Sequence, residues 1–210
     1  MEGDSMTVYK FRTPVSEEEA RRLRVGDELR LSGRIITARD QAHVRALKRR
    51  EEGKPIPVSF EGLGLFHSGP LVEKTGDRWR VVCAGPTTSA RMESVEARFL
   101  EAFKPRIVIG KGGMGLETAE ALGRVGAAYC SFTGGAGLLV ADAVKEVEAV
   151  EWLDLGVPEA LWLLRVEGFG PLTVAMDASG SNLYADVARK VQANRAKIYE
   201  RIGLKQTTSL

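Results

Sequence analysis

The feature that most constrains the fold of this chain is a β-branched segment that runs directly into a glycine-dense turn. Arg106-Ile107-Val108-Ile109 is typical of a buried strand, and four glycines follow within the six positions Gly110 to Gly115. A helical segment comes next at residues 115–124, and the order repeats with a strand at 127–130 and a helix at 136–144. Strands that alternate with helices predict an α/β architecture.

The part of the chain before residue 106 has a different pattern. Ser16-Glu17-Glu18-Glu19 is a capping box, which is typical of the start of a short helix. Alternating apolar positions predict strands at residues 7–11, 28–36, 64–67 and 79–84, and helical periodicity predicts helices at 37–50 and 87–103. We therefore expect an antiparallel, β-rich first part packed with the α/β second part as one domain over residues 1–210. The ends, residues 1–6 and 203–210, are expected to be flexible.

The last 65 residues give further predictions. We expect an extended segment at residues 146–155, a short helix that starts at Pro158 and a strand at 172–176. A closing helix rich in Arg and Lys is expected at 182–202.

Charge and cysteine content exclude several classes of protein. Thirty Lys and Arg stand against 28 Asp and Glu, a net charge of +2, so strong non-specific binding to nucleic acid is not implied. The only cysteines, Cys83 and Cys130, exclude a disulfide framework and do not supply a cluster or zinc site by themselves. The uncharged stretch 125–141 is broken by glycines, and no secretory signal opens the chain. We expect a soluble cytoplasmic protein with no membrane partner.

The glycine-dense turn is the first candidate binding segment. Lys111 and the backbone N–H groups of the turn, aided by the start of the following helix, predict an anion clamp. The turn is not a Walker A loop, because Lys111 is followed by Gly112. Its letters match the GxxG loop of RNA-binding KH domains, but that loop joins two helices and here the preceding segment is a strand. A plain strand–helix turn with a solvated lysine is the alternative.

Two other strand-to-helix junctions carry polar residues. Thr87-Thr88-Ser89 precedes Arg91, whose guanidinium could bind a carboxylate bidentately, although Thr87 or Thr88 could simply cap the helix. Arg39-Asp40-Gln41-Ala42-His43 starts a helix and could equally be an ordinary charged surface.

The two histidines are expected to be structural. His67 is followed by Ser68, but adjacent residues do not form a nucleophile and its base, and no G-x-S-x-G elbow is present. Because strand-to-helix junctions collect at one edge of an α/β sheet, Arg39, Arg91 and Lys111 together would suit a small di-anion.

Three motifs in this order resemble the C-terminal domain of class I (iron–sulfur) fumarases. The same resemblance extends to the separate β subunits of tartrate dehydratase and of two-subunit fumarases. The motifs are Thr37-Ala38-Arg39-Asp40-Gln41-Ala42-His43, Gly85-Pro86-Thr87-Thr88-Ser89-Ala90-Arg91-Met92 and Gly110-Lys111-Gly112-Gly113-Met114-Gly115. Later stretches fit as well, at Glu159 to Trp162 and Asp177 to Leu183, so that the resemblance spans about residues 7–201.

The resemblance implies a swivelling β/β/α domain and the reversible hydration of an unsaturated dicarboxylate. In the family, three cysteines of the other domain or of an α subunit hold a [4Fe-4S] cluster. Neither Cys83 nor Cys130 lies in such a motif, so the chain resembles a β subunit that is active only with an α subunit, in an α2β2 assembly.

The resemblance also implies roles for individual residues. Arg39, Arg91 and Lys111 would bind substrate carboxylates, and Thr87 would lie at the substrate and take part in proton transfer. Thr88 would cap the helix, and Asp40 and His43 would support the site.

Fumarate hydratase is the leading activity, with L-tartrate dehydratase as the alternative. A nucleic-acid or nucleotide-binding module that uses the loop 110–115 is the alternative from a different class, against which the near-neutral charge speaks. An inactive scaffold is a third possibility, disfavoured by the presence of all four site residues.

Overall fold

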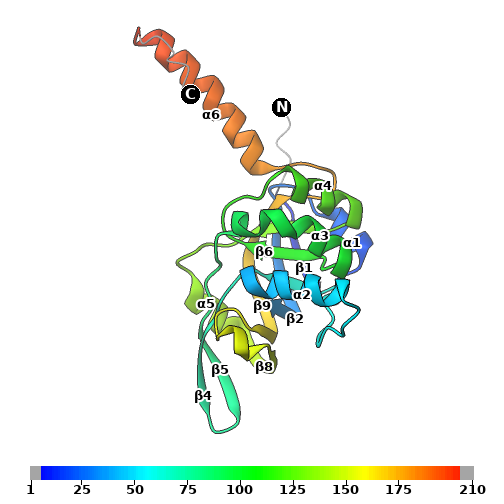
Figure 1. Cartoon of the computed structure of the whole chain (residues 1–210). Coiled ribbons are helices and arrows are strands. Elements are labelled where there is room, and N and C mark those ends of the chain that lie inside the picture. Colours follow the sequence, from blue (N-terminus) through cyan, green and yellow to red (C-terminus); the bar gives the residue numbers. More distant parts are fainter. Residues whose placement is uncertain (1–5, 204–210) are drawn as a thin grey trace.

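The computed structural model describes residues 6–203, and the chain alternates strands and helices over most of that length (Figure 1). Most of the two ends expected to be flexible, residues 1–5 and 204–210, lie outside the described residues. The strands are β1 Val8–Arg12, β2 Glu28–Thr37, β3 Gly64–Phe66, β4 Leu71–Thr75, β5 Arg78–Cys83, β6 Ile107–Gly110, β7 Ala128–Ser131, β8 Val144–Glu151 and β9 Leu161–Met176. The helices are α1 Glu17–Arg22, α2 Asp40–Glu51, α3 Glu93–Phe103, α4 Leu116–Val125, α5 Gly137–Ala143 and α6 Leu183–Arg201, with 3₁₀ turns at Ser89–Met92 and Leu153–Leu155. The predicted α/β architecture is confirmed.

The main sheet closes on itself. Its strand order is β1-β2-β3-β6-β7-β9-β8, and a further pairing joins β2 to β9. The pairs from β1 to β7 are parallel, whereas β9 runs antiparallel to β7, β8 and β2. The strands β2, β3, β6, β7 and β9 therefore form a small barrel, and β4 and β5 form a separate hairpin that projects from one end of the molecule (Figure 1).

Side chains alternate between two cores along the barrel strands. Ile35, Phe66 and Ile109 point into the barrel, where they join one buried cluster. Their neighbours Ile36 and Leu65 face outward and join a second cluster beneath α2, α3 and α4. Both faces of the central strands are thus covered, which is why β6 is apolar and buried at every position.

The antiparallel pairing expected for the first part of the chain is confirmed for β4 and β5 but is wrong for β1, β2 and β3. β1 and β2 are parallel, from Val8 opposite Glu28 to Arg12 opposite Ser32. Parallel strands need a crossover, and α1 supplies it between β1 and β2. The capping box that starts α1 is confirmed, because the Ser16 hydroxyl accepts from the Glu19 N–H and the Glu19 carboxylate accepts from the Ser16 N–H.

The helix expected to start at Pro158 is also wrong. β9 begins at Leu161 and runs for 16 residues, so the strand expected at 172–176 is only its last part. Its alternating burial is interrupted around Gly168 and Gly170, where the register against β2 shifts. These interruptions hide the periodicity of the longest strand. The strand β4 was not expected either.

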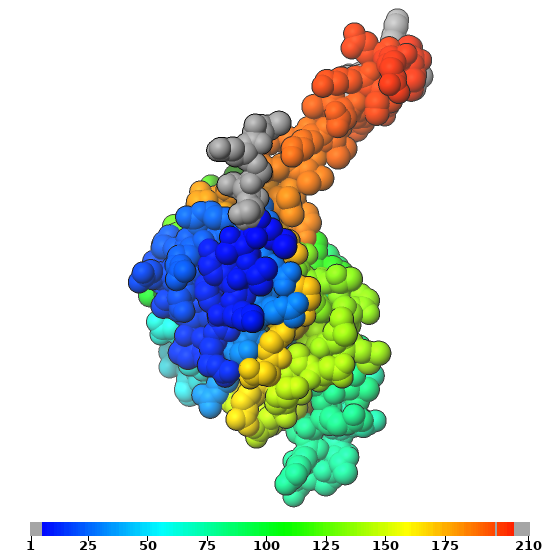
Figure 2. Space-filling model, turned by 180° about the vertical axis from the view of Figure 1, so that it is seen from behind, coloured from blue at the N-terminus to red at the C-terminus, as the bar shows by residue number. Residues whose placement is uncertain are grey.

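The closing helix α6 is present and leaves the body of the molecule at the end opposite the β4–β5 hairpin (Figures 1 and 2). The Asn182 side chain caps it by accepting from the N–H groups of Tyr184 and Ala185. None of the helices among residues 6–203 combines the length and apolar character needed to cross a membrane.

Candidate active site

The carboxyl ends of the parallel strands meet at one edge of the barrel. Backbone hydrogen bonds between neighbouring segments continue beyond the ends of the strands. The Ala38 N–H donates to the Phe66 carbonyl at 3.0 Å, and the His67 N–H donates to the Ile109 carbonyl at 2.8 Å. The segment after β5 joins the same edge, because the Thr87 N–H donates to the His67 carbonyl at 2.7 Å. The Ser89 N–H donates to the Lys111 carbonyl at 3.0 Å. The three motifs singled out from the sequence therefore lie side by side.

Asp40 joins the two arginines of the candidate site. Its carboxylate accepts from Arg39 Nε at 3.2 Å and from Arg91 Nε at 3.1 Å, and a second, shorter contact joins it to Arg91 Nη2. Arg91 Nη1 donates to Thr87 Oγ1 at 3.2 Å. Three of the four predicted site residues thus form one cluster, with Asp40 as the support that the resemblance implies.

The two arginines differ in how far they are available to a ligand. Arg39 is also paired with Glu159, at 2.8 Å, and its side chain is only 22% exposed. The Arg91 side chain is 46% exposed, and it pairs with the carboxylate of Asp40, which also contacts Arg39. Arg91 is therefore the more accessible donor, and Glu159 is a support for Arg39 that the sequence interpretation missed.

Lys111 lies beside this cluster and carries an uncompensated charge. It is exposed, pairs with Thr88 through an isolated backbone bridge, and its aliphatic chain rests against Gly134. Within residues 6–203 no carboxylate lies within ion-pair distance of its ammonium, whereas Arg39 and Arg91 both have carboxylate partners. The ammonium group is free to bind an anion.

Two glycines shape the turn around Lys111. A side chain at Gly110 would overlap the Ser89 hydroxyl, so glycine allows the 3₁₀ turn Ser89–Met92 to pack directly on β6. Gly112 has a φ of +76°, which other residues rarely adopt. These constraints explain the glycine-dense sequence without requiring a phosphate-binding loop.

The expectation that a helix start strengthens the anion clamp is wrong. The Glu93 carboxylate of α3 already accepts from the Gly115 N–H at 2.7 Å, the Thr118 N–H at 3.3 Å and the Thr118 hydroxyl at 2.8 Å. The N-terminus of α4 is thus capped by a protein carboxylate. The Glu93 carboxylate thus takes the position at this helix start that a bound anion would need.

Thr88 lies at the expected cap position, but the expected hydrogen bond from its side chain is absent. Thr88 occupies the N-cap position of the 3₁₀ turn, but its side chain makes no capping hydrogen bond. The half-buried Thr87 instead directs its hydroxyl toward Arg91.

A buried ionisable cluster lies directly behind this edge. Glu96 Oε2 is 3.2 Å from His43 Nε2 and 3.3 Å from His67 Nε2, and all three side chains are fully buried. Burial alone raises the pKa of Glu96, but the facing imidazoles of His67 and His43 outweigh it and lower the pKa to about 2. The sequence interpretation missed Glu96, although it lies on the apolar face of α3 between Met92 and Phe99.

This cluster is neither a hydrolase triad nor a complete structural metal site. His67 Nδ1 lies 2.9 Å from the Ser89 hydroxyl, but both residues are fully buried and out of reach of a substrate. His43, His67 and Glu96 place one donor atom each within 4.8 Å of one another, whereas a structural zinc site needs four donors. Both histidines are fully buried, which agrees with the structural role expected of them and excludes the charged surface considered for the segment of His43.

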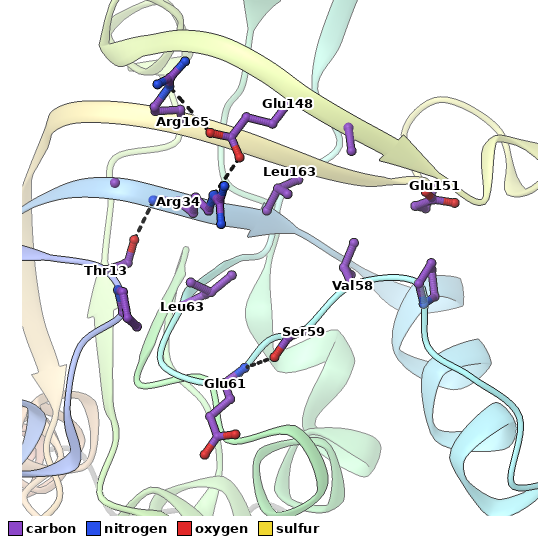
Figure 3. Close-up of a pocket in the computed structure, with 14 residues that line it drawn as sticks. Thr13, Arg34, Val58, Ser59, Glu61, Leu63, Glu148, Glu151, Leu163 and Arg165 are labelled. Carbon is purple, nitrogen blue, oxygen red and sulfur yellow. Dashed lines mark hydrogen bonds and ion pairs between the residues drawn. The ribbon is translucent and has the colours of Figure 1, made fainter.

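A cleft elsewhere on the molecule has a volume of about 640 Å³, and none of the predicted site residues lines it. Its lining residues are drawn in Figure 3. It lies along β2, β8 and β9 and the segment 57–63. Both of its arginines are already paired, since Glu148 lies 2.7 Å from Arg34 Nε and 3.6 Å from Arg165 Nε (Figure 3). The candidate active site therefore lies at the edge of the barrel where the parallel strands end, and not in this cleft.

The two cysteines do not fit a [4Fe-4S] cluster. A cluster of the expected kind needs three thiolates, and the chain has only Cys83 and Cys130. Cys130 points into the barrel core, where burial raises the pKa of its thiol to about 12.

Comparison with known proteins agrees with the motifs at this edge. Residues 2–187 match the model of the Fumarase C-terminus family. The L(+)-tartrate dehydratase subunit beta of Escherichia coli K12 is 43% identical over 190 residues, which cover 90% of this chain and 93% of that protein. A Methanocaldococcus jannaschii protein that provisionally carries the same name is 40% identical over 197 residues, covering 93% and 99% of the two chains.

A longer relative carries the same region as part of a larger chain. It is a Geobacillus stearothermophilus protein provisionally named fumarate hydratase class I, and it is 39% identical over 183 residues. These residues cover 87% of this chain but only 34% of that protein. The family match and these full-length similarities show that this chain belongs to the Fumarase C-terminus family.

Proposed function

We propose that this chain is the β subunit of a hydro-lyase that adds water reversibly to fumarate to form malate. The observation that carries the proposal is the cluster of Arg39, Thr87 and Arg91 beside the unpaired ammonium of Lys111. Two separated cationic groups next to a hydroxyl suit a substrate with two carboxylates and a carbon from which a proton is moved. Family membership supports this reaction class.

The substrate carboxylates would be bound by Arg91 and Lys111. Arg91 keeps an exposed edge although Asp40 holds it in place, so it can donate to a carboxylate without rearrangement. Arg39, fixed between Asp40 and Glu159, would contribute positive charge and position Asp40.

Thr87 would move the proton at the substrate carbon. A threonine hydroxyl is a weak base unless its neighbours stabilise the charged oxygen. Arg91 Nη1 donates to Thr87 Oγ1 at 3.2 Å, which stabilises negative charge on that atom.

The [4Fe-4S] cluster would be held by an α subunit. When bound, such a cluster supplies a Lewis acid for the substrate hydroxyl. We further propose that residues 1–210 form one swivelling β/β/α domain and that the assembly is α2β2. The names of the full-length relatives, which designate a subunit beta, support an α partner.

The test is an anaerobic assay of the complex formed by this chain and its co-purifying, cysteine-bearing partner, followed by loss of fumarate absorbance. Arg91→Ala and Lys111→Ala should each remove about 2–5 kcal/mol of transition-state stabilisation, about 30-fold or more in kcat/KM. Arg80→Ala is the matched control, because among residues 6–203 the ion-pair partner of Arg80 is the exposed Glu73 on the hairpin. Wild-type turnover by both site variants would refute the proposal, as would an iron-free chain that binds RNA in a salt-sensitive way.

L-tartrate dehydration is the second candidate. It is favoured by the similarity over nearly the full length of two proteins named as tartrate dehydratase β subunits. Tartrate has one more hydroxyl than malate, and that group would need an additional hydrogen-bond partner. Turnover of tartrate but not of malate by the same complex would keep the site and change the substrate.

A further inference from the structure

A chain of buried polar side chains connects the two segments that carry Thr87 and Lys111. It runs from Glu96 to His67, from His67 Nδ1 to the Ser89 hydroxyl at 2.9 Å, and from there to the Tyr129 hydroxyl at 3.0 Å. The Tyr129 hydroxyl also lies 2.8 Å from the Gly112 carbonyl. All four side chains are fully buried, so bulk water does not satisfy these groups.

The Tyr129 hydroxyl faces two acceptors, the Gly112 carbonyl at 2.8 Å and the Ser89 hydroxyl at 3.0 Å. A carbonyl oxygen can only accept, so Tyr129 is the donor to Gly112. The Ser89 hydroxyl lies between Tyr129 and His67 Nδ1 and contacts both. At the other end of the chain, His67 Nε2 lies 3.3 Å from the Glu96 carboxylate, a close approach without an aligned hydrogen bond.

The two middle members of this chain, His67 and Ser89, touch the candidate site through their backbones. The His67 carbonyl accepts from the Thr87 N–H at 2.7 Å, and the Ser89 N–H donates to the Lys111 carbonyl at 3.0 Å. Tyr129 holds the carbonyl of Gly112, the residue directly after Lys111 and the one with positive φ. The side chains and backbone of the same residues thus tie the Thr87 segment to the Lys111 turn.

We infer that the buried chain Glu96–His67–Ser89–Tyr129 is a positioning network that sets the Lys111 ammonium relative to Thr87, with Tyr129 as the positioning residue for the lysine turn. The inference rests on the proposed function, because it assigns the network an effect through Lys111. Tyr129 touches no substrate. A misplacement of about 1 Å at a substrate-binding group is sufficient to slow catalysis strongly.

The test is a double-mutant cycle in the assembled enzyme. Tyr129→Phe removes one oxygen and keeps the ring in the core, so folding can be checked by thermal unfolding of the same sample. We expect Tyr129→Phe to lower kcat/KM about 10-fold or more with Lys111 present, and to have almost no effect in a Lys111→Ala background. A role in stability alone would not depend on Lys111.

Tyr184→Phe is the matched control. It removes the same atom from a tyrosine on the other side of the turn, whose hydroxyl donates to Ser131 at 3.0 Å and whose ring lies against Gly113. We expect its kcat/KM to stay within about 2-fold of the wild type. An equal loss in Tyr184→Phe would overturn the inference, because the effect would not be specific to the network.

The outcomes separate the two proposals. If Lys111→Ala alone retains wild-type activity, the proposed function fails at that residue. If Lys111→Ala is impaired while Tyr129→Phe is fully active, or is equally harmful in both backgrounds, the proposed function stands and the positioning network is refuted.

Discussion

At the scale of single residues, charged side chains are stabilised in two different environments. Arg39 and Arg91 are fixed by carboxylates at a half-open edge, whereas Glu96 is ionised in the core because two imidazoles face it. A buried carboxylate of this kind makes the fold sensitive to acid. Its native pKa lies near 2 while an unfolded chain protonates near 4.5.

The first prediction concerns that sensitivity. The pKa of Glu96 is lower in the folded state, so its contribution to stability is complete above about pH 5 and is lost as pH falls toward 2. The advantage of the wild type over Glu96→Gln in the free energy of unfolding should shrink by about 3 kcal/mol over that range. Urea unfolding at several pH values measures it. A difference that is constant with pH would show that Glu96 is not ionised in the folded protein.

At the scale of secondary-structure elements, the site depends on close packing between the 3₁₀ turn Ser89–Met92 and the end of β6. Gly110 is fully buried there, and any side chain on it would meet the Ser89 hydroxyl. The contact keeps the Thr87 segment and the Lys111 turn adjacent. It also explains why a glycine is needed at a position whose backbone angles any residue could adopt.

The second prediction follows from this contact. Gly110→Ala should destabilise the fold by about 1–3 kcal/mol through overpacking, and should lower the activity of the assembled enzyme. Gly135→Ala is the matched control, since a Cβ there meets nothing within 4 Å. Denaturant midpoints of the three proteins test the idea. Equal midpoints for Gly110→Ala and the wild type would mean that the turn has room to move.

At the scale of the whole molecule, α6 is set apart from the two cores. It projects from the body of the molecule (Figure 2). Along it, Val187, Val191 and Ile198 are each about half exposed, at 49%, 56% and 47%. Among the side chains of α6 that the structure describes, Leu183 and Tyr184 at its start are the ones that pack against the buried cluster under the helices. The family match ends at residue 187, within the first turns of this helix.

The third prediction is that the body of the protein does not depend on the projecting part of α6. A chain that ends at Ala188 should keep the thermal midpoint of the full chain within about 2 °C, because little apolar surface is uncovered. A chain that ends at Asn182 should melt at a clearly lower temperature, because it also loses Leu183 and Tyr184 from the core. Circular dichroism during heating measures both, and a large drop for the longer truncation would contradict the prediction.

Local patterns determined much of this protein from sequence alone. The capping box of α1, the β6–turn–α4 unit, the helix after Asn182 and the three polar junctions were all predictable, because each depends on residues a few positions apart. The order of those junctions along the chain was also sufficient to identify the family resemblance.

Only the tertiary structure decided how these parts meet. β9 closes the barrel by pairing Thr173 with Glu28, and Glu93 caps a helix that starts 23 residues later. Glu96 is ionised in the core because His43 and His67 come from two other segments. Such contacts depend on chain segments far apart in sequence, whose pairing is set by packing of the whole barrel and leaves no local periodicity to read.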